Sequence, residues 1–169
     1  MSHSDSVHPK GLSMIAKRRI EAEILSHVYE VLKESHGTEV AQKTLGDAVR
    51  RSAIEQAERF AQAEDQPTSL DSFIELSKLW ETEDALRIDV QERTEDTYAF
   101  NVVRCRYAEM YKDMGLQEIG HLLSCQRDGT FCEGYDPNLE FSRTQTIMQG
   151  ASHCDFRYTY KKDDQKDKS

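Results

Sequence analysis

The chain has 169 residues, of which 31% are charged and 37% are hydrophobic, and its formal net charge is −9 at pH 7. This length suits one domain with a real core and is short for two, and the composition is far from that of a disordered protein. The acidic balance argues against nucleic acid or an anionic membrane as the main partner, because both require a basic surface.

The sequence also indicates in which compartment the protein is expected. No apolar run approaches the roughly eighteen residues that span a bilayer, and the first residues lack the basic-then-apolar form of a secretory signal. The four cysteines are irregularly spaced and do not follow the pattern of a disulfide scaffold. We therefore expect a cytoplasmic protein whose thiols are free or bound to a metal.

The first elements are expected to be helices. Residues 1–9 are predicted to be a flexible N-terminus, residues 161–169 a disordered tail, and residues 10–160 a single domain. Apolar residues recur at steps of three and four from Met14 to Leu32, and Gly37 is predicted to end this helix. A second helix is expected from Thr38 to Ala61, and a third from Thr68 or Ser69 through Trp80.

The apolar face of the first helix is interpreted as its buried face. It includes Ile20, Ile24, Val28 and Val31, and His27 among them is interpreted as a core histidine. Glu21 is assigned to the solvated side of the same helix.

The spacing of the apolar residues changes at residue 86 from the helical period to every second residue. Alternation over residues 86–91 and 98–102 predicts a β-hairpin. Helical spacing returns from Cys105 to Ser124, with a break at Gly115, and a polar loop is expected from Gly129 to Asn138. A second strand pair is expected over residues 139–143 and 154–160, with Gly150 between them at a positive φ. The predicted fold is α+β, with the N-terminal helices packed on a small antiparallel sheet made of two hairpins with an intervening helical segment.

Three cysteines are the first candidates for chemistry. Cys105 ends a predicted strand, Cys125 ends a helix and Cys154 opens the last strand. Cysteine is among the most buried residue types, so each could simply pack in the core. Alternatively, Cys125 or Cys154 could act as a nucleophile, or all three could bind a divalent metal such as zinc as a structural or catalytic site. The spacing alone does not choose among these.

Charged and polar residues lie next to these cysteines. Asp128 follows Cys125 by three residues, and Asp155 follows Cys154 directly. A carboxylate alone raises the pKa of a thiol, so a reactive thiolate would need a cation or imidazole such as Arg127, Arg143 or His153. His153 is a candidate general acid or base, and an exposed turn histidine without a role is the competing interpretation. Arg143 could pair with an aspartate or grip a substrate carboxylate.

The pattern resembles the L-2-amino-thiazoline-4-carboxylic acid hydrolase family over most of residues 15–160. The resemblance is carried by residues 105–108 (CRYA), 125–128 (CQRD), 135–139 (YDPNL), 141–146 (FSRTQT) and 150–157 (GASHCDFR), with weaker likeness at 19–22 and 37–41. It implies an enzyme that opens the ring of a cyclic amidine acid and gives an N-carbamoyl amino acid.

The resemblance and the clustering together assign roles. We expect Cys125, Asp128, Cys154, Asp155 and His153 to be catalytic, and Arg143 and Thr144 to bind the substrate. In the expected reaction, Asp128 or Asp155 hydrogen-bonds the amidinium, water or a thiolate adds to carbon 2, and the bond to the ring sulfur breaks.

The alternative is a small-molecule-binding or sensor domain with a structural metal held by Cys105, Cys125 and Cys154. The expected partner is a small-molecule substrate rather than nucleic acid or membrane, and a homo-oligomer is possible.

Overall fold

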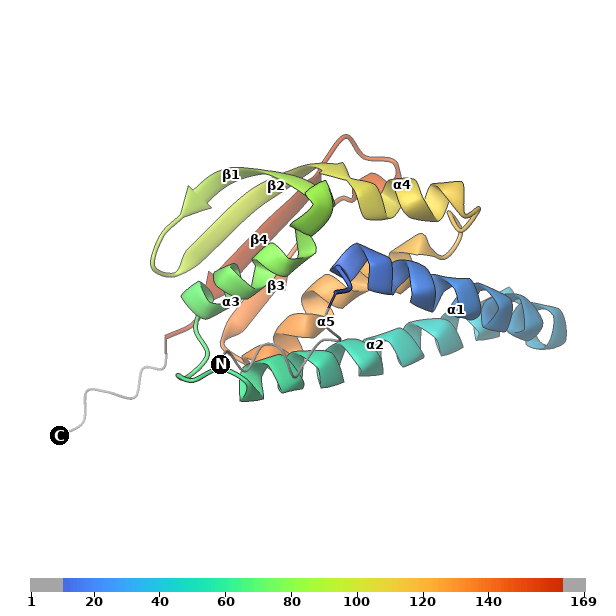
Figure 1. Ribbon diagram of the computed structural model, residues 1–169, viewed down its shortest axis with the longest axis horizontal. Helices are drawn as coiled ribbons and strands as arrows, with labels where there is room; N and C mark the ends of the chain where they lie inside the picture. The colour runs from blue at the N-terminus through green and yellow to red at the C-terminus, as the bar shows by residue number, and fades with distance from the viewer. Residues whose placement is uncertain (1–10, 163–169) are drawn as a thin grey trace.

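The computed structural model describes residues 11–162. Two long helices and several shorter ones pack against one side of a four-stranded antiparallel sheet (Figure 1). This confirms the expected α+β class. The predicted flexible N-terminus and most of the predicted tail lie outside the described residues.

The first two helices form an antiparallel hairpin, α1 (Met14–His36) and α2 (Thr38–Gln62). The Ser13 side chain caps α1 by accepting a hydrogen bond from the Ala16 N–H at 3.3 Å. Gly37 ends α1 at φ 86° and donates its N–H to the Lys33 carbonyl at 2.9 Å. A positive φ is easily adopted only by glycine, so the predicted end of the helix is confirmed.

The buried face of α1 differs from the expected one. Its fully buried residues are Met14, Arg18, Ala22 and Tyr29. Ile20, Ile24, Val28 and Val31 are exposed, and so is His27. Two apolar stripes run along this helix, and the one that faces the core also includes Ile15, Leu25 and Leu32, which are partly buried against it. The assignments of these residues and of His27 to the core were therefore wrong.

A short helical region leads to the sheet. Helix α3 (Leu70–Ser77) begins at Ser69, whose side chain accepts from the Ser72 N–H while Ser72 reciprocates. Two 3₁₀ turns follow, η2 (Lys78–Trp80) and η3 (Thr82–Asp84), with Glu83 at φ 61°. This kink turns the chain into the first strand and leaves Glu81 beside the sheet.

The four strands are β1 (Leu86–Arg93), β2 (Thr97–Cys105), β3 (Leu139–Ser142) and β4 (Cys154–Tyr160), in the order β1-β2-β4-β3. Pairing of β2 with β4 joins the two predicted strand pairs into one sheet and sets Phe100 opposite Phe156. On β4 the residues Cys154, Phe156 and Tyr158 are buried, because alternate side chains point to the helical layer.

Three helical segments connect the two halves of the sheet: α4 (Arg106–Asp113), the π-helical turn η4 (His121–Cys125) and α5 (Gln126–Tyr135). Gly115 breaks the region at φ 72°, as expected, and η5 (Ile147–Gln149) ends at Gly150 with φ 98°, also as expected.

The predicted loop from Gly129 to Asn138 was wrong, because most of it is α5. Its glycines mark close packing rather than a loop. A Cβ at Gly134 would collide with the Ile54 carbonyl oxygen of α2, and a Cβ at Gly129 would lie 3.0 Å from the Phe141 ring of β3. Both residues therefore let α5 fit between α2 and the sheet.

None of the helices within residues 11–162 combines the length and the apolar character needed to cross a membrane.

Candidate functional site

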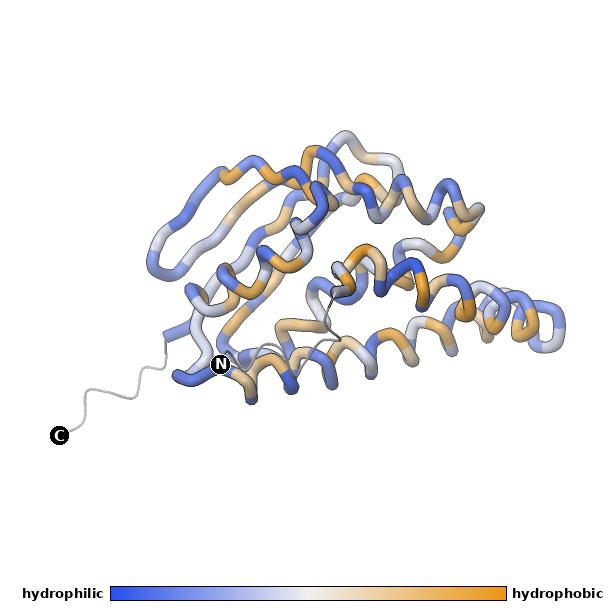
Figure 2. Tube along the Cα trace, in the orientation of Figure 1, coloured by the Kyte–Doolittle hydropathy of each residue, from blue (hydrophilic) through white to orange (hydrophobic). Residues whose placement is uncertain are grey.

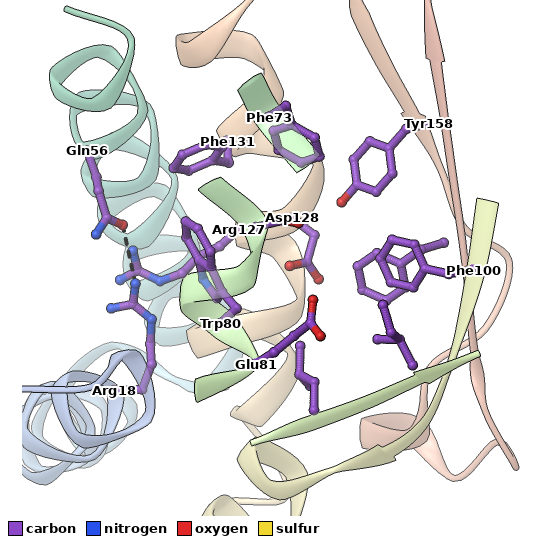
Figure 3. Close-up of a pocket in the computed structure, with 14 residues that line it drawn as sticks. Arg18, Gln56, Phe73, Trp80, Glu81, Phe100, Arg127, Asp128, Phe131 and Tyr158 are labelled. Carbon is purple, nitrogen blue, oxygen red and sulfur yellow. Dashed lines mark hydrogen bonds between the residues drawn. The ribbon is translucent and has the colours of Figure 1, made fainter. Parts of the chain in front are cut away.

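A small cavity lies between the helical layer and the inner face of the sheet (Figure 3). Its volume is about 70 Å³, several times the roughly 10–15 Å³ that a single water needs. The wall is formed by residues of α1, α2, α3, η2, α5 and strands β1, β2 and β4, together with Glu81. Sequence segments far apart in the chain meet here.

One end of the cavity carries two buried arginines, Arg18 of α1 and Arg127 of α5. Arg18 Nη1 donates to both carboxylate oxygens of Glu21, at 2.6 and 2.5 Å, and its Nη2 donates to Gln56 Oε1 at 3.3 Å. Arg127 Nη2 donates to Glu21 at 3.3 Å, and its Nε donates to the Leu123 carbonyl at 3.0 Å. Figure 3 shows the two guanidinium groups side by side at the end of Gln56.

The charges at this end do not balance. Two guanidinium groups share the single carboxylate of Glu21, so one positive charge is left over. Burial, and next the charge of Arg18, lower the pKa of Arg127 to about 10. An anionic ligand group placed here would relieve this repulsion, and arginine pairs well with carboxylates. Glu21, which was assigned to the solvated side of α1, has a side chain that is 38% exposed and that also holds both arginines.

Two carboxyl groups, Asp128 and Glu81, lie further along the cavity and face one another in Figure 3. Burial raises the pKa of Asp128 to about 6, outweighing the nearby Arg143 that lowers it. The Asp128 side chain is nevertheless 28% exposed, and it lines the cavity. Burial also raises the pKa of Glu81. With a pKa of about 6, Asp128 can therefore accept and release a proton close to neutral pH.

Aromatic rings form the rest of the wall. Trp80 and Phe131 meet edge to face with ring centroids 5.3 Å apart, and Phe100 stacks on Phe156 at 5.0 Å. Phe73 and Tyr158 complete this group. A flat, small ligand with an anionic end and a cationic end matches such a wall, because polar groups occupy defined positions in an apolar surround.

Arg143 is held by the protein itself. Its Nη1 donates to Asp128 Oδ2 at 2.6 Å and its Nη2 donates to the Cys125 carbonyl at 3.0 Å. The guanidinium also lies over the rings of Phe141 and Phe156, at 5.3 and 5.2 Å from their centroids. Of the two roles left open for Arg143, the structure shows the ion pair with an aspartate.

The cysteines Cys105, Cys125 and Cys154 come together behind Asp128, close enough for electrostatic coupling between them. Burial raises the pKa of Cys105 to about 11, raises that of Cys125 well above the usual range, and raises that of Cys154 as well. Each of these thiols is therefore neutral near pH 7. Two of them accept backbone hydrogen bonds, Cys105 from Ala108 at 3.4 Å and Cys154 from Ile147 at 3.1 Å.

The geometry gives the metal alternative no support. Among residues 11–162, no three side chains of histidine, cysteine, aspartate or glutamate are arranged so that they could hold a metal ion. The three cysteines are neighbours without forming a ligand set.

Asp155, Thr144 and His153 lie in a separate group. Asp155 alternates with the inward-facing Cys154 and Phe156, so it belongs to the opposite face of β4. It accepts hydrogen bonds from the Thr144 N–H and the Gln145 N–H, each at 2.9 Å, and from the Thr144 hydroxyl. Partial burial raises the pKa of Asp155, but these hydrogen bonds outweigh it and lower the pKa to about 2. Through these hydrogen bonds the Asp155 carboxylate holds the segment after β3 against β4.

His153 belongs to the same turn. Its backbone carbonyl accepts from Gln145 Nε2 at 3.0 Å, and its ring lies beside the Ser152 hydroxyl at 2.9 Å. The structure thus divides the predicted residues into two sets. Asp128, Arg143, Cys125 and Cys154 are together at or behind the cavity, whereas the other three hold a turn.

Sequence reasoning missed Arg18, Gln56, Trp80 and Glu81 as site residues. One signal for Arg18 was present, since it falls at the buried spacing of Met14, Ala22 and Tyr29. A charged residue on a buried face is expensive unless it is paired or functional. Glu81 gave no such signal, because its segment has no regular period.

Two solved structures share the fold. The trafficking protein particle complex subunit 3 of Naegleria fowleri, covalently bound to palmitic acid, matches with a TM-score of 0.51 and 10% identity, covering 86% of this chain and 96% of that chain. The phenol-responsive sensory domain of the transcription activator PoxR, solved with phenol, matches with a TM-score of 0.51 and 14% identity, covering 82% of this chain and 73% of that chain. No curated protein matches the chain in sequence.

The family comparison agrees with the motifs read from the sequence. The model of the L-2-amino-thiazoline-4-carboxylic acid hydrolases matches residues 17–158, which include the buried arginines, both carboxyl groups and the three neighbouring cysteines. The chain belongs to the L-2-amino-thiazoline-4-carboxylic acid hydrolase family.

Proposed function

We propose that this protein is a hydrolase that opens the ring of a small cyclic amidine acid of the 2-amino-thiazoline-4-carboxylate type and yields an N-carbamoyl amino acid. The observation that carries the proposal is the polarity of the cavity. Two buried arginines stand at one end, two carboxyl groups stand further along, and aromatic rings lie between sheet and helices.

The proposed binding mode follows from these charges. The substrate carboxylate forms an ion pair with the guanidinium groups of Arg18 and Arg127, because Glu21 neutralises only one of their two positive charges. The amidinium of the ring donates hydrogen bonds to Asp128 and Glu81, as guanidinium-like groups do with carboxylates. The ring itself lies among the aromatic side chains. Arg143, which is already paired with Asp128, positions that carboxylate rather than holding the substrate.

The proposed chemistry is addition of water followed by loss of sulfur. The oxygen of a water molecule bonds to the amidinium carbon while ionised Asp128 takes one of its protons. The bond from that carbon to the ring sulfur then breaks, its electron pair goes to the sulfur, and Asp128 returns the proton to form the thiol. The carbon–oxygen double bond forms as the hydroxyl proton passes to solvent water, which removes the proton that had made the substrate an amidinium, and the product is a neutral N-carbamoyl group on the amino acid.

Water is favoured over a thiolate as the nucleophile because burial keeps the thiols neutral. Cys125→Ala separates the two routes. In the water route this variant keeps turnover within about tenfold of the native rate, whereas removal of a nucleophile lowers the rate by orders of magnitude. Cys105 and Cys154 serve in this scheme as packing behind Asp128.

A second candidate is a binding or sensor domain. It is favoured by the mainly aromatic wall and by the fold shared with a sensory domain that was solved with phenol. A domain of this kind would bind an aromatic ligand without converting it. The paired arginines and the facing carboxyl groups favour the hydrolase, because a neutral phenol would leave these buried charges unused.

The test is incubation of purified protein with L-2-amino-thiazoline-4-carboxylate, followed by mass spectrometry for N-carbamoylcysteine. The matched control is Asp128→Asn, which keeps the shape of the side chain and removes its basicity. Turnover by the native protein and its loss in the variant support the proposal. Binding of phenol without turnover of the amidine acid or of related hydantoins would support the sensor domain and refute the hydrolase.

A further inference from the structure

Tyr158 of β4 is a buried residue whose hydroxyl opens on the cavity and has no partner in the fold. The residue is only 4% exposed, and it lines the cavity. No hydrogen bond joins its hydroxyl to another residue within the range 11–162 that the structure describes. The hydroxyls of Tyr29 and Tyr111 are sealed inside the protein, whereas that of Tyr158 faces the cavity (Figure 3). A hydroxyl in a small, mainly apolar cavity requires a partner, so this partner must come from what the cavity holds.

Packing accounts for the ring of Tyr158 but not for its hydroxyl. The ring centroid lies 4.8 Å from that of Phe73 on α3 and 4.9 Å from that of Phe141 on β3. In Figure 2 hydrophobic positions recur along α3, the helix that carries Phe73. A phenylalanine would fill the same place in this wall, as it does at the neighbouring Phe156 and Phe100. These contacts hold the ring in one position and so fix the direction of the hydroxyl.

The hydroxyl is directed at the end of the cavity where the reaction is proposed. In Figure 3 it points from β4 toward the side on which the Asp128 carboxyl group lies. Burial raises the pKa of Tyr158 well above its ordinary value, and the negative charge of Asp128 adds to this effect. The hydroxyl therefore keeps its proton at neutral pH and can donate a hydrogen bond.

The proposed reaction supplies one acceptor at this end. The nitrogens of the amidinium only donate, and their hydrogens meet Asp128 and Glu81. A hydrogen bond donated to the water would occupy the electron pair that attacks the carbon. The ring sulfur, which is bonded to the same carbon, is left. It is a weak acceptor as a thioether, but it becomes a stronger one when it receives the electron pair of the breaking bond.

We propose that Tyr158 is a catalytic residue whose hydroxyl donates a hydrogen bond to the ring sulfur as the carbon–sulfur bond breaks. The electron pair of that bond goes to the sulfur, Tyr158 keeps its own proton, and the proton of the new thiol still comes from Asp128. An interaction that strengthens in the transition state raises the rate without tightening substrate binding. This inference rests on the proposed function and assigns the residue that assists departure of the sulfur.

The first test is Tyr158→Phe, with steady-state kinetics on L-2-amino-thiazoline-4-carboxylate. Loss of one donor to a developing oxyanion lowers kcat by about 100- to 1000-fold. Charge on sulfur is more diffuse, so we expect kcat to fall by about 10- to 100-fold while KM stays within about threefold. The Tm should not fall, because the variant loses a hydroxyl that has no partner in the fold. Tyr29→Phe is the matched control, since Tyr29 is also buried, at 2% exposed, but does not line the cavity.

The second test concerns the direction of the hydrogen bond. Fluorine on the ring makes the hydroxyl a stronger donor and a weaker acceptor, so Tyr158→3-fluorotyrosine should raise kcat above the native value. A lower kcat at unchanged KM would mean that the hydroxyl accepts a hydrogen bond from the attacking water, and it would overturn the assignment to the sulfur.

The outcomes separate this inference from the function on which it rests. Turnover by the native protein together with an unchanged kcat in Tyr158→Phe overturns the role of Tyr158 and leaves the hydrolase standing. A Tyr158→Phe variant that loses rate and Tm together shows that the hydroxyl serves the fold, which also overturns the role. Absence of turnover by the native protein refutes the proposed function and this inference with it.

Discussion

The contact between α2 and α5 can be tested at a single glycine, Gly134. A methyl group added there would overlap the Ile54 carbonyl oxygen of α2 and would lie 3.0 Å from the Ala57 side chain. Neither neighbour can swing aside, because one is backbone and the other is a methyl group on a helix. We therefore expect Gly134→Ala to force the two helices apart.

The cost can be estimated from two opposing effects. Overpacking of a well-packed contact costs about 1–3 kcal/mol. Alanine in place of glycine within a helix returns up to about 1 kcal/mol. The expected net loss is on the order of 1–2 kcal/mol, and in a chain of this length each kcal/mol lowers Tm by about 2–4 °C.

Gly46→Ala is the matched control, since Gly46 also lies within a helix. The nearest heavy atom to its added Cβ would be Gln126 Oε1 at 3.5 Å, an ordinary contact. This variant should gain the helix propensity without the overlap, so its Tm should rise by a few degrees. Thermal and urea unfolding of both variants provide the measurement. A Gly134→Ala protein as stable as the native one would show that the close approach of α5 to α2 is not as described.

Three further predictions concern the site. If ionised Asp128 is the base, kcat/KM should rise as the pH rises through about 6. The free energy of unfolding should fall as the pH rises from 3.8, the ordinary pKa of an aspartate, to about 6, because over this range the folded state binds a proton that the unfolded state has lost. Urea unfolding of Asp128→Asn should not show this pH dependence. Arg127→Lys should raise KM for an amidine acid by about tenfold or more with a smaller change in kcat, because a lysine cannot donate two parallel hydrogen bonds to the substrate carboxylate. An unchanged KM in steady-state kinetics would place the substrate carboxylate elsewhere. Asp155→Asn should lower stability by about 1 kcal/mol while turnover stays near native, and loss of turnover in a folded variant would return Asp155 to the catalytic set.

Local patterns were sufficient for most elements. The two long helices, the break at Gly115 and the positive φ at Gly150 all follow from periodicity or from the conformational freedom of glycine, which act over a few residues. The four strands were likewise visible as alternation. The α5 helix was missed because Gly129 and Gly134 look like loop residues until the neighbouring α2 and β3 are known.

The pairing within the site depended on long-range contacts. The motifs singled out Asp128, Arg143, Cys125 and Cys154, and these four do meet in the fold. The same reasoning grouped Asp155 and His153 with them, but the alternation of β4 turns Asp155 to the other face. A short sequence distance along a strand says little about a shared site, since neighbouring side chains point in opposite directions.

The sequence by itself determined the class of fold, the family and the position of most elements, because hydrophobic periods and motif residues are properties of adjacent positions. Only the tertiary structure decided which face of α1 is buried, and that decision placed Arg18 in the cavity and left Ile24 outside. It also brought Glu81 to Asp128, which is 47 residues further along the chain. Burial beside distant residues sets the charge and the pKa of such groups, and no local pattern contains that information.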